Sequence, residues 1–172
     1  MAGTEIATGE KADLLEALAK HRHFLRFTVR DLTDEQAGLR PTASELCLGG
    51  LIKHVADAER SWADFILEGA ASNPGYSEEA MAQWAARFRM APEDTLEQIL
   101  AQYQEAADRT DQIVRDLPDL DRSHQLPEAP WYQPGTSWSA RRVLLHIIAE
   151  TAQHAGHADI LRESIDGSKT MG

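Results

Sequence analysis

The sequence predicts an all-α protein that folds as a single four-helix bundle. Four long stretches carry apolar residues at steps of three and four, which is the spacing of one helix face. No stretch shows the strict alternation of a half-buried strand. With 172 residues, the chain has about the size of one domain with a substantial core. We therefore assign residues 1–172 to one domain and expect residues 1–9 and 168–172 to be flexible.

The first two helices are recognised by their ends as well as by their apolar faces. The first is predicted from about Lys11 to Asp31, and a T-x-x-Q capping box follows it at Thr33. The second is predicted from about Leu48 to Glu68, with Gly69 in the position where helices commonly end. His54 lies on the apolar face of this second helix, which places an imidazole toward the core.

The third and fourth helices are the longest of the four that the apolar pattern predicts. The third is predicted from Pro92 to Leu117, since proline suits the first helical position. The fourth is predicted from about Trp138 to Ile165, with Ser137 or Ser139 as its cap and Gly167 as its stop. Because the fourth helix is apolar nearly all round, we expect it to be mostly buried.

Two long connections complete the predicted fold. Residues 70–91 are expected to cover one end of the bundle. Residues 119–136 contain several prolines together with Trp131 and Tyr132, and loops of this length in compact domains are usually functional or disordered. With Trp138, these aromatic residues either line the mouth of a pocket or pack against the core.

Four ionisable residues form a ladder on the apolar fourth helix: His146, Glu150, His154 and His157. At about 100° per residue they project from one side of the helix, within roughly 80° of one another. Ile147, Ile160 and Leu161 border that side, so we expect it to face the interior. Burying these groups without partners would be costly, and either a cation or a closed hydrogen-bond network would offset the cost.

His54 supplies the third point of a metal site. Glu150 and His154 are one turn apart and can bind one ion. A third ligand from a facing helix would complete a metal site of the kind found in the cores of helix bundles. Three protein ligands leave a coordination position for water or substrate. Two imidazoles and one carboxylate suit zinc, which we expect first, and also nickel or ferrous iron. The plainer interpretations are a satisfied core histidine and a surface pair on one helix.

Charge and composition exclude several classes of function. A net charge of −11 repels phosphate backbones and anionic lipids, so we expect neither nucleic-acid nor membrane binding. The N-terminal residues lack a signal-peptide pattern, and one cysteine, Cys47, cannot form an internal disulfide, which favours a cytoplasmic location. Without an evident base beside it, Cys47 is interpreted as a small apolar residue. His21, His23 and His124 are interpreted as surface residues.

The sequence also resembles a known family. The stretch SARRVLLHIIAETAQHAGHADILRESIDG, residues 139–167, resembles the C-terminal signature of the mini-DinB proteins of the DinB/YfiT-like superfamily. LGGLIKHVADAERSWADFILEG resembles the second-helix signature, and LTDEQAGLRPTASELCL resembles the segment before it. The resemblance covers nearly the whole chain. It implies a four-helix bundle, usually a homodimer, with a divalent metal between the second and fourth helices.

One ligand position narrows the resemblance to a branch. Many family members carry H-x-x-x-H on the last helix, whereas this chain has E-x-x-x-H at Glu150 and His154. That variant resembles the mycothiol-dependent maleylpyruvate isomerase branch, whose triad is His, Glu, His, and His54, Glu150 and His154 match it. His157 falls where relatives often carry glutamine, which makes it a supporting group or an alternate ligand. His146 lies outside the triad and either supports the site or packs in the core.

The resemblance implies an enzyme: a metal-dependent S-transferase or isomerase that uses a low-molecular-weight thiol such as mycothiol or bacillithiol on a small-molecule substrate. In that reading, His157 or His146 would relay a proton. Two alternatives use the same three ligands. One is a non-catalytic metal-binding protein whose ion ties two helices together, and the other is a metal-dependent hydrolase.

Overall fold

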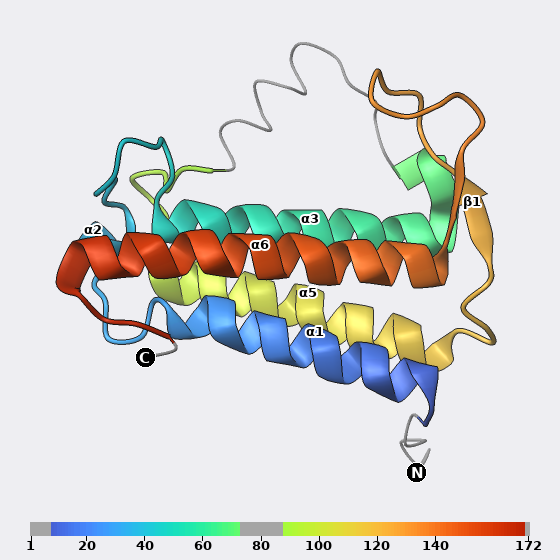
Figure 1. Ribbon diagram of the computed structural model, residues 1–172, viewed down its shortest axis with the longest axis horizontal. Coiled ribbons are helices and arrows are strands. Elements are labelled where there is room, and N and C mark those ends of the chain that lie inside the picture. The colour runs from blue at the N-terminus through green and yellow to red at the C-terminus, as the bar shows by residue number, and fades with distance from the viewer. Residues whose placement is uncertain (1–7, 73–87, 171–172) are drawn as a thin grey trace.

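Four long helices form the bundle in the computed structural model, which describes residues 8–72 and 88–170 (Figure 1). They are α1 (Glu10–Phe27), α3 (Leu48–Glu68), α5 (Leu96–Asp116) and α6 (Ala140–Asp166). Helices α1 and α6 run in one direction and α3 and α5 in the other. Each of α1 and α3 contacts both α5 and α6, so the four helices enclose a common core. The predicted all-α four-helix fold is confirmed.

Side-chain caps determine where several helices begin. Thr33 and Gln36 form the predicted capping box of the short helix α2 (Asp34–Ala37), in which the Thr33 hydroxyl accepts a hydrogen bond from the Gln36 amide at 3.2 Å. The Ser139 hydroxyl accepts from the Arg142 amide and starts α6. Gly167 ends α6 in the left-handed conformation, with φ of 78°. The caps predicted for α2 and α6 are thus confirmed.

Helix α5 begins later than predicted. Thr95, rather than a residue before Pro92, caps it by accepting a hydrogen bond from the amide of Gln98. The preceding turn is held by Asp94, which accepts from the Ala91 amide and pairs with Lys53 of α3. The hydrogen bonds of this turn therefore place the start of α5 after Thr95, and not at Pro92 as predicted.

Two short strands were not predicted. β1 (Ser123–Gln125) and β2 (Ser137–Ser139) pair antiparallel, with His124 opposite Trp138. Strands of three residues are too short to show an alternating pattern, which is why the sequence did not reveal them. The hairpin carries its loop over the end of the bundle where α3 finishes and α6 begins. Of the connection expected at 70–91, residues 73–87 lie outside the described part, and Gly69–Ser72 form a 3-10 turn, η1.

A polar layer divides the core into two apolar clusters. One cluster surrounds Leu18, Phe65 and Ile147 near the hairpin, and the other surrounds Leu25, Leu51 and Tyr103 near the opposite end. Between them, buried charged and polar side chains lie at the middle of the helices: Arg22, His54, Glu59, Thr110 and Thr151. The site residues belong to this middle layer.

Helix α6 is less buried than predicted. Leu145 and Ile160 retain 48% and 60% of their exposed surface. The prediction that Ile160 borders an interior face is therefore wrong, because the contacts of α6 with the other long helices are chiefly to α1 and α3, and Ile160 lies outside them among the described residues. None of the described helices combines the length and apolar character needed to cross a membrane.

Candidate metal centre

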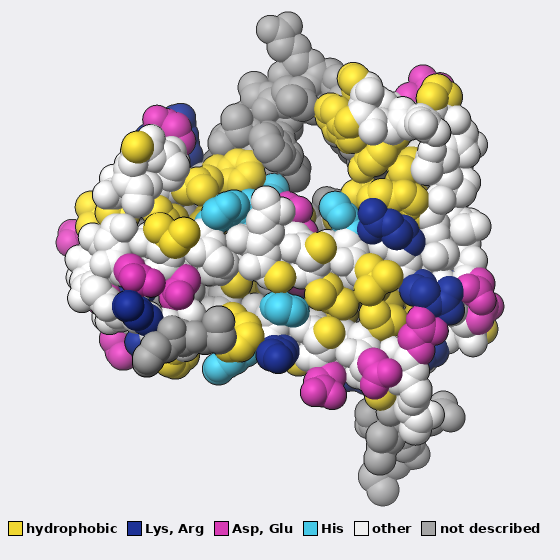
Figure 2. Space-filling view, in the orientation of Figure 1, with side chains coloured by type: hydrophobic (Ala, Val, Ile, Leu, Met, Phe, Trp, Pro, Cys, Tyr) yellow, Lys and Arg dark blue, Asp and Glu magenta, His cyan; other side chains and the backbone are white. Residues whose placement is uncertain are grey.

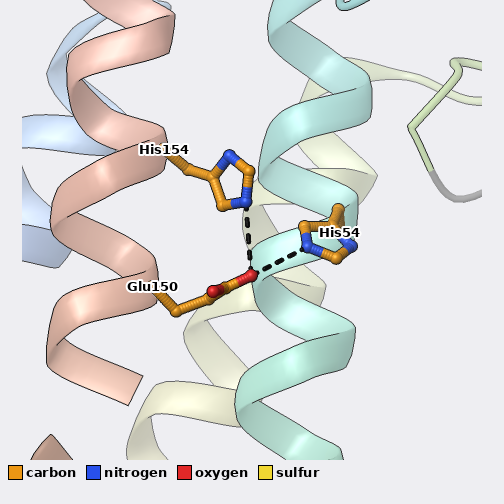
Figure 3. A group of neighbouring side chains, drawn as sticks. All are labelled: His54, Glu150 and His154. Atoms are coloured by element: carbon orange, nitrogen blue, oxygen red, sulfur yellow. Dashed lines mark hydrogen bonds and ion pairs between the residues drawn. The ribbon is translucent and has the colours of Figure 1, made fainter. Parts of the chain in front are cut away.

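His54, Glu150 and His154 meet between α3 and α6 (Figure 3). The Glu150 carboxylate oxygen Oε1 lies 3.2 Å from Nε2 of His54 and 3.3 Å from Nε2 of His154. The two imidazole rings approach edge to face, with centroids 5.0 Å apart. One carboxylate oxygen thus stands between two ring nitrogens that come from different helices. The sequence prediction that these three side chains converge is confirmed by this geometry.

The site is deep but reachable from one side. His54 is 5% exposed, whereas 26% of the Glu150 side chain remains accessible. Figure 2 shows histidine and acidic side chains together at the edge of α6, with hydrophobic side chains on both sides. A small molecule could therefore approach the carboxylate while its surroundings stay apolar.

Phe88 closes one side of the site, and Gly50 explains how it comes so near. The ring of Phe88 stacks on the His54 imidazole at 4.0 Å between centroids. A Cβ atom added to Gly50 would lie 2.0 Å from the Phe88 carbonyl oxygen, so only glycine allows this backbone approach. The two glycines at the start of α3 were not recognised as site residues in the sequence.

The imidazoles stabilise the ionised form of Glu150. Hydrogen bonding by His154, and then by His54, holds the pKa of the Glu150 carboxyl well below its usual range, against the opposing effect of burial. The carboxylate is therefore negatively charged at neutral pH. The triad presents one anionic oxygen and two nitrogens toward the same point.

The donor set fits a divalent ion. Two ligands about 2.1 Å from a zinc ion at a tetrahedral angle lie roughly 3.4 Å apart, close to the two measured oxygen–nitrogen separations. One ligand atom from each residue lies within 4.8 Å of the others, so a small inward movement of the two imidazoles would complete the spacing. These residues could hold zinc, nickel or iron.

His157 contacts a member of the triad. Its Nδ1 lies 3.4 Å from Nδ1 of His154, on the side of that ring opposite the Glu150 carboxylate. A partner at Nδ1 fixes the tautomer and orientation of a metal-binding imidazole. The structure therefore places His157 behind His154, rather than in the triad itself.

His146 packs in an aromatic group one turn before Glu150. Its ring meets Trp62 and Trp138 in edge-to-face geometry, with centroids 4.9 Å and 5.2 Å away, and the two indoles stack on each other at 5.0 Å. Burial lowers the pKa of His146, partly opposed by the nearby Glu150 charge. The predicted ladder thus separates into the triad, His157 behind it, and His146 beside it.

Trp62 and Arg142 lie near the triad and were not singled out as candidate site residues in the sequence. Trp62, Glu150 and Thr151 border a narrow gap between α3 and α6 that is too small for a water molecule. The Arg142 guanidinium lies over the Trp138 ring, 4.1 Å from its centroid. For Arg142 a signal was present, because Arg142 precedes His146 by four residues and continues the same helical face.

The remaining candidates take structural positions. Cys47 is buried at the N-terminus of α3, with its thiol directed to the Phe88 carbonyl at 3.7 Å, in agreement with a small packed residue. His23 is exposed as predicted. The prediction is wrong for His124, whose Nε2 is buried and whose ring packs on Phe65 and against Gly69, because strand β1 turns it inward. Trp131 is 56% exposed.

Comparisons with known proteins agree with this architecture. The family model described as Mycothiol-S-transferase matches residues 13–167. The crystal structure of a conserved protein from Enterococcus faecalis is similar, with a TM-score of 0.65 over 94% of this chain and 100% of that chain. Its sequence is 14% identical, so this likeness shows the fold alone. No curated protein is significantly similar to the chain. Because the family model matches most of the chain, including both helices that carry the triad, the chain belongs to the mycothiol-S-transferase family, which has the DinB/YfiT-like fold.

Proposed function

We propose that the protein is a metal-dependent S-transferase that joins a low-molecular-weight thiol, mycothiol or a related compound, to a small electrophilic substrate. The family match supports thiol transfer as the class of reaction. The observation that carries the proposal is the convergence of His54, Glu150 and His154 within 4.8 Å on the accessible side of the α3–α6 seam. Addition to an unsaturated acid, followed by release of the thiol, would give isomerisation by the same site.

We assign His54, Glu150 and His154 as ligands of one divalent ion, with zinc as the first expectation and nickel or iron as alternatives. When bound, such an ion lowers the pKa of a thiol that reaches it, so that the sulfur is a nucleophile at neutral pH. Three protein ligands leave a position for that sulfur. In S-transfer, the carbon–sulfur bond forms as the leaving group departs with its electron pair.

The neighbouring residues would prepare this step. His157 orients His154 through the contact between their Nδ1 atoms. His146, kept neutral by its buried setting and close to the Glu150 charge, is our candidate to accept the thiol proton and pass it to solvent. Phe88, stacked on His54, keeps water from that face of the site.

Metal analysis tests the first part of the proposal. Protein purified without a histidine tag should carry close to one equivalent of a divalent ion, and His54→Ala, Glu150→Ala and His154→Ala should each lose it. Stoichiometric metal in the His54→Ala protein would contradict the three-ligand assignment. His23→Ala is the matched control, because it removes an exposed imidazole of α1 that does not belong to the triad.

The thiol is tested on cobalt-substituted protein. Binding of a thiol sulfur to the ion should add a sulfur-to-cobalt charge-transfer band when mycothiol is titrated into the protein, whereas a methylated, sulfur-blocked analogue should not. A site that holds cobalt without responding to any thiol would favour the alternatives, a non-catalytic metal-binding protein or a hydrolase. A homodimer and a cytoplasmic location stay predictions, and sedimentation velocity measures the first.

A further inference from the structure

Arg142 is unusual among the arginines of this acidic protein. Eleven of the twelve arginines in the described residues donate a hydrogen bond or form an ion pair through the guanidinium: Arg22, Arg26, Arg30, Arg40, Arg60, Arg89, Arg109, Arg115, Arg122, Arg141 and Arg162. Arg142 does neither within the part of the chain that is described; its guanidinium only lies on the Trp138 indole. Among the described residues of a chain with 28 acidic side chains, Arg142 is thus the arginine whose guanidinium has neither a hydrogen-bond nor an ion-pair partner.

The position of this guanidinium relates it to the triad. Arg142, His146, Glu150 and His154 follow one another at steps of four along one face of α6. The first and third of these lie about 12 Å apart along the helix axis, at about 1.5 Å per residue. Burial lowers the pKa of His146 and raises that of Tyr132, and the Arg142 charge is near enough to act on both groups, adding to the first shift and opposing the second. Arg142 therefore faces the same side as the site, two turns away from its carboxylate.

Aromatic rings fill the interval between the guanidinium and the triad. Trp138 stacks on Trp62, both indoles meet His146 in edge-to-face geometry, and Tyr132 meets Trp138 at 5.8 Å. Trp62 in turn borders the same narrow gap as Glu150. Figure 2 shows basic and hydrophobic side chains next to the histidine and acidic groups on this edge of α6. Aromatic side chains thus lie between the triad and the positive charge of Arg142.

From this arrangement we infer that the electrophilic substrate carries a carboxylate on a flat body, and that Arg142 binds this carboxylate while the reacting carbon lies at the triad. This inference rests on the proposed S-transfer. Its chemistry follows from the guanidinium, whose paired N–H groups match the two oxygens of a carboxylate and whose plane is held in place by the indole beneath it. Trp62 and Trp138 contact the flat body, and Arg142 acts as a specificity-determining residue rather than in the chemical step.

A matched pair of substrates tests the inference. The first is 4-(chloromethyl)phenylacetate. The second is 4-(chloromethyl)phenylacetamide, in which a neutral carboxamide replaces the carboxylate. In both, the thiolate of mycothiol attacks the chloromethyl carbon, the carbon–sulfur bond forms, and chloride leaves with the bonding pair. Because a methylene group separates the ring from the carboxylate, the two chlorides have nearly the same intrinsic reactivity. The metal-loaded protein should prefer the carboxylate by about tenfold or more in kcat/KM.

Arg142→Gln should abolish this preference, because it should raise the KM for the carboxylate far more than the KM for the amide. Arg142→Lys should keep part of it, since the charge remains but the paired donors do not. Arg141→Gln is the matched control, because it removes the same charge one residue away from a guanidinium already engaged by Glu10. Equal losses on both substrates would mean that Arg142 only supports Trp138 and would overturn the inference. So would an unchanged preference, or a change confined to the KM of the thiol.

Binding of unreactive analogues separates this inference from the proposed reaction. Calorimetry with 4-methylphenylacetate and 4-methylphenylacetamide needs no turnover. Tighter binding of the acid to the wild-type protein, lost in Arg142→Gln, would support the carboxylate site even if neither chloride reacted, and the S-transfer proposal would then fail alone. Equal binding of acid and amide would overturn the carboxylate site even if both chlorides were turned over.

Discussion

Two groups of ionisable side chains share the polar layer of the bundle, and they differ in how their charge is balanced. In the first group, Arg22 donates to Glu59 at 3.2 Å and to Asp111 at 2.8 Å, joining α1 to α3 and α5. Glu59 is 1% exposed and is paired with the guanidinium through both oxygens. In the second, Glu150 is balanced by imidazoles alone among the described residues.

The difference separates a closed network from an open one. The Arg22 group contains its own cation, so its polar atoms are satisfied within the protein. The Glu150 group offers donor atoms of the kind metals prefer and lies on the accessible side of the seam. The first group should therefore contribute to folding whatever the solution contains, whereas the second should depend on an added ion.

Breaking the closed network should have the largest effect on stability. In Arg22→Met, Glu59 would remain buried without its cation, which costs about 3–5 kcal/mol of unfolding free energy. Urea denaturation followed by circular dichroism measures this, and the metal content should stay unchanged. Arg115→Met is the control: Arg115 contacts the same Asp111 from an exposed position at 3.7 Å, and such surface pairs contribute about 1 kcal/mol or less. Equal losses in the two variants would contradict the closed-network interpretation.

Removing the ion should have the next largest effect. The apolar clusters can hold the four helices without it, so the chelated protein should keep its helical signal. It should lose the linkage term, about 2.7 kcal/mol when the metal concentration is about 100 times Kd. At this chain length that corresponds to roughly 5–10 °C in Tm. Loss of most of the helix signal on chelation would show that the ion is required for folding and would favour the non-catalytic alternative.

The Glu150 group could be predicted from the sequence, whereas the Arg22 group was much harder to recognise there. His54 and the ladder at 146–157 stood out because imidazoles are rare on apolar faces, and the spacing of four identified which could share an ion. Glu59 follows Val55 by four residues on the same buried face, and Arg22 follows Leu18 in the same way, but charges are common on helices. Their partnership depends on how α1 and α3 pack, which periodicity does not determine.

The aromatic neighbourhood was harder to predict for a different reason. The hairpin that carries Trp138 has three-residue strands, and Phe88 reaches His54 because Gly50 leaves room for its backbone. Both are long-range contacts made by irregular segments. The helical pattern therefore predicted the bundle and the triad, whereas the walls of the site became visible only in the structure.

Acidification should remove the metal's contribution while sparing that of the closed network. Protons compete with the ion for the imidazole nitrogens, whose unperturbed pKa is about 6.5. Metal occupancy, and with it the stability difference between metal-loaded and chelated protein, should fall between about pH 6 and pH 5. Thermal unfolding with limiting metal across this range measures the difference. Full occupancy at about pH 4.5 would contradict ligation by His54 and His154.

His157→Ala should weaken the open group without emptying it. Loss of the contact at His154 Nδ1 should lower metal affinity by about tenfold, or about 1.4 kcal/mol of the linkage stabilisation. Competition with a coloured chelator measures the affinity directly. Affinity reduced as severely as in His154→Ala would instead identify His157 as a ligand.

The smallest effect should come from Glu150→Gln in the absence of metal. In the folded chain the imidazoles hold the pKa of Glu150 below its usual value, so ionised Glu150 stabilises the fold at pH values above its unfolded pKa of about 4.3. That contribution is lost as pH falls toward the lower pKa of the folded state. At pH 7 the chelated variant should therefore be less stable than the chelated wild type, by about 1 kcal/mol for the hydrogen bonds weakened. The gap should shrink steadily below about pH 4. Chemical denaturation at pH 7 and pH 3 measures both values. A loss at pH 7 as large as that of Arg22→Met would show that the triad is itself a closed network, and the proposed need for an ion would fail.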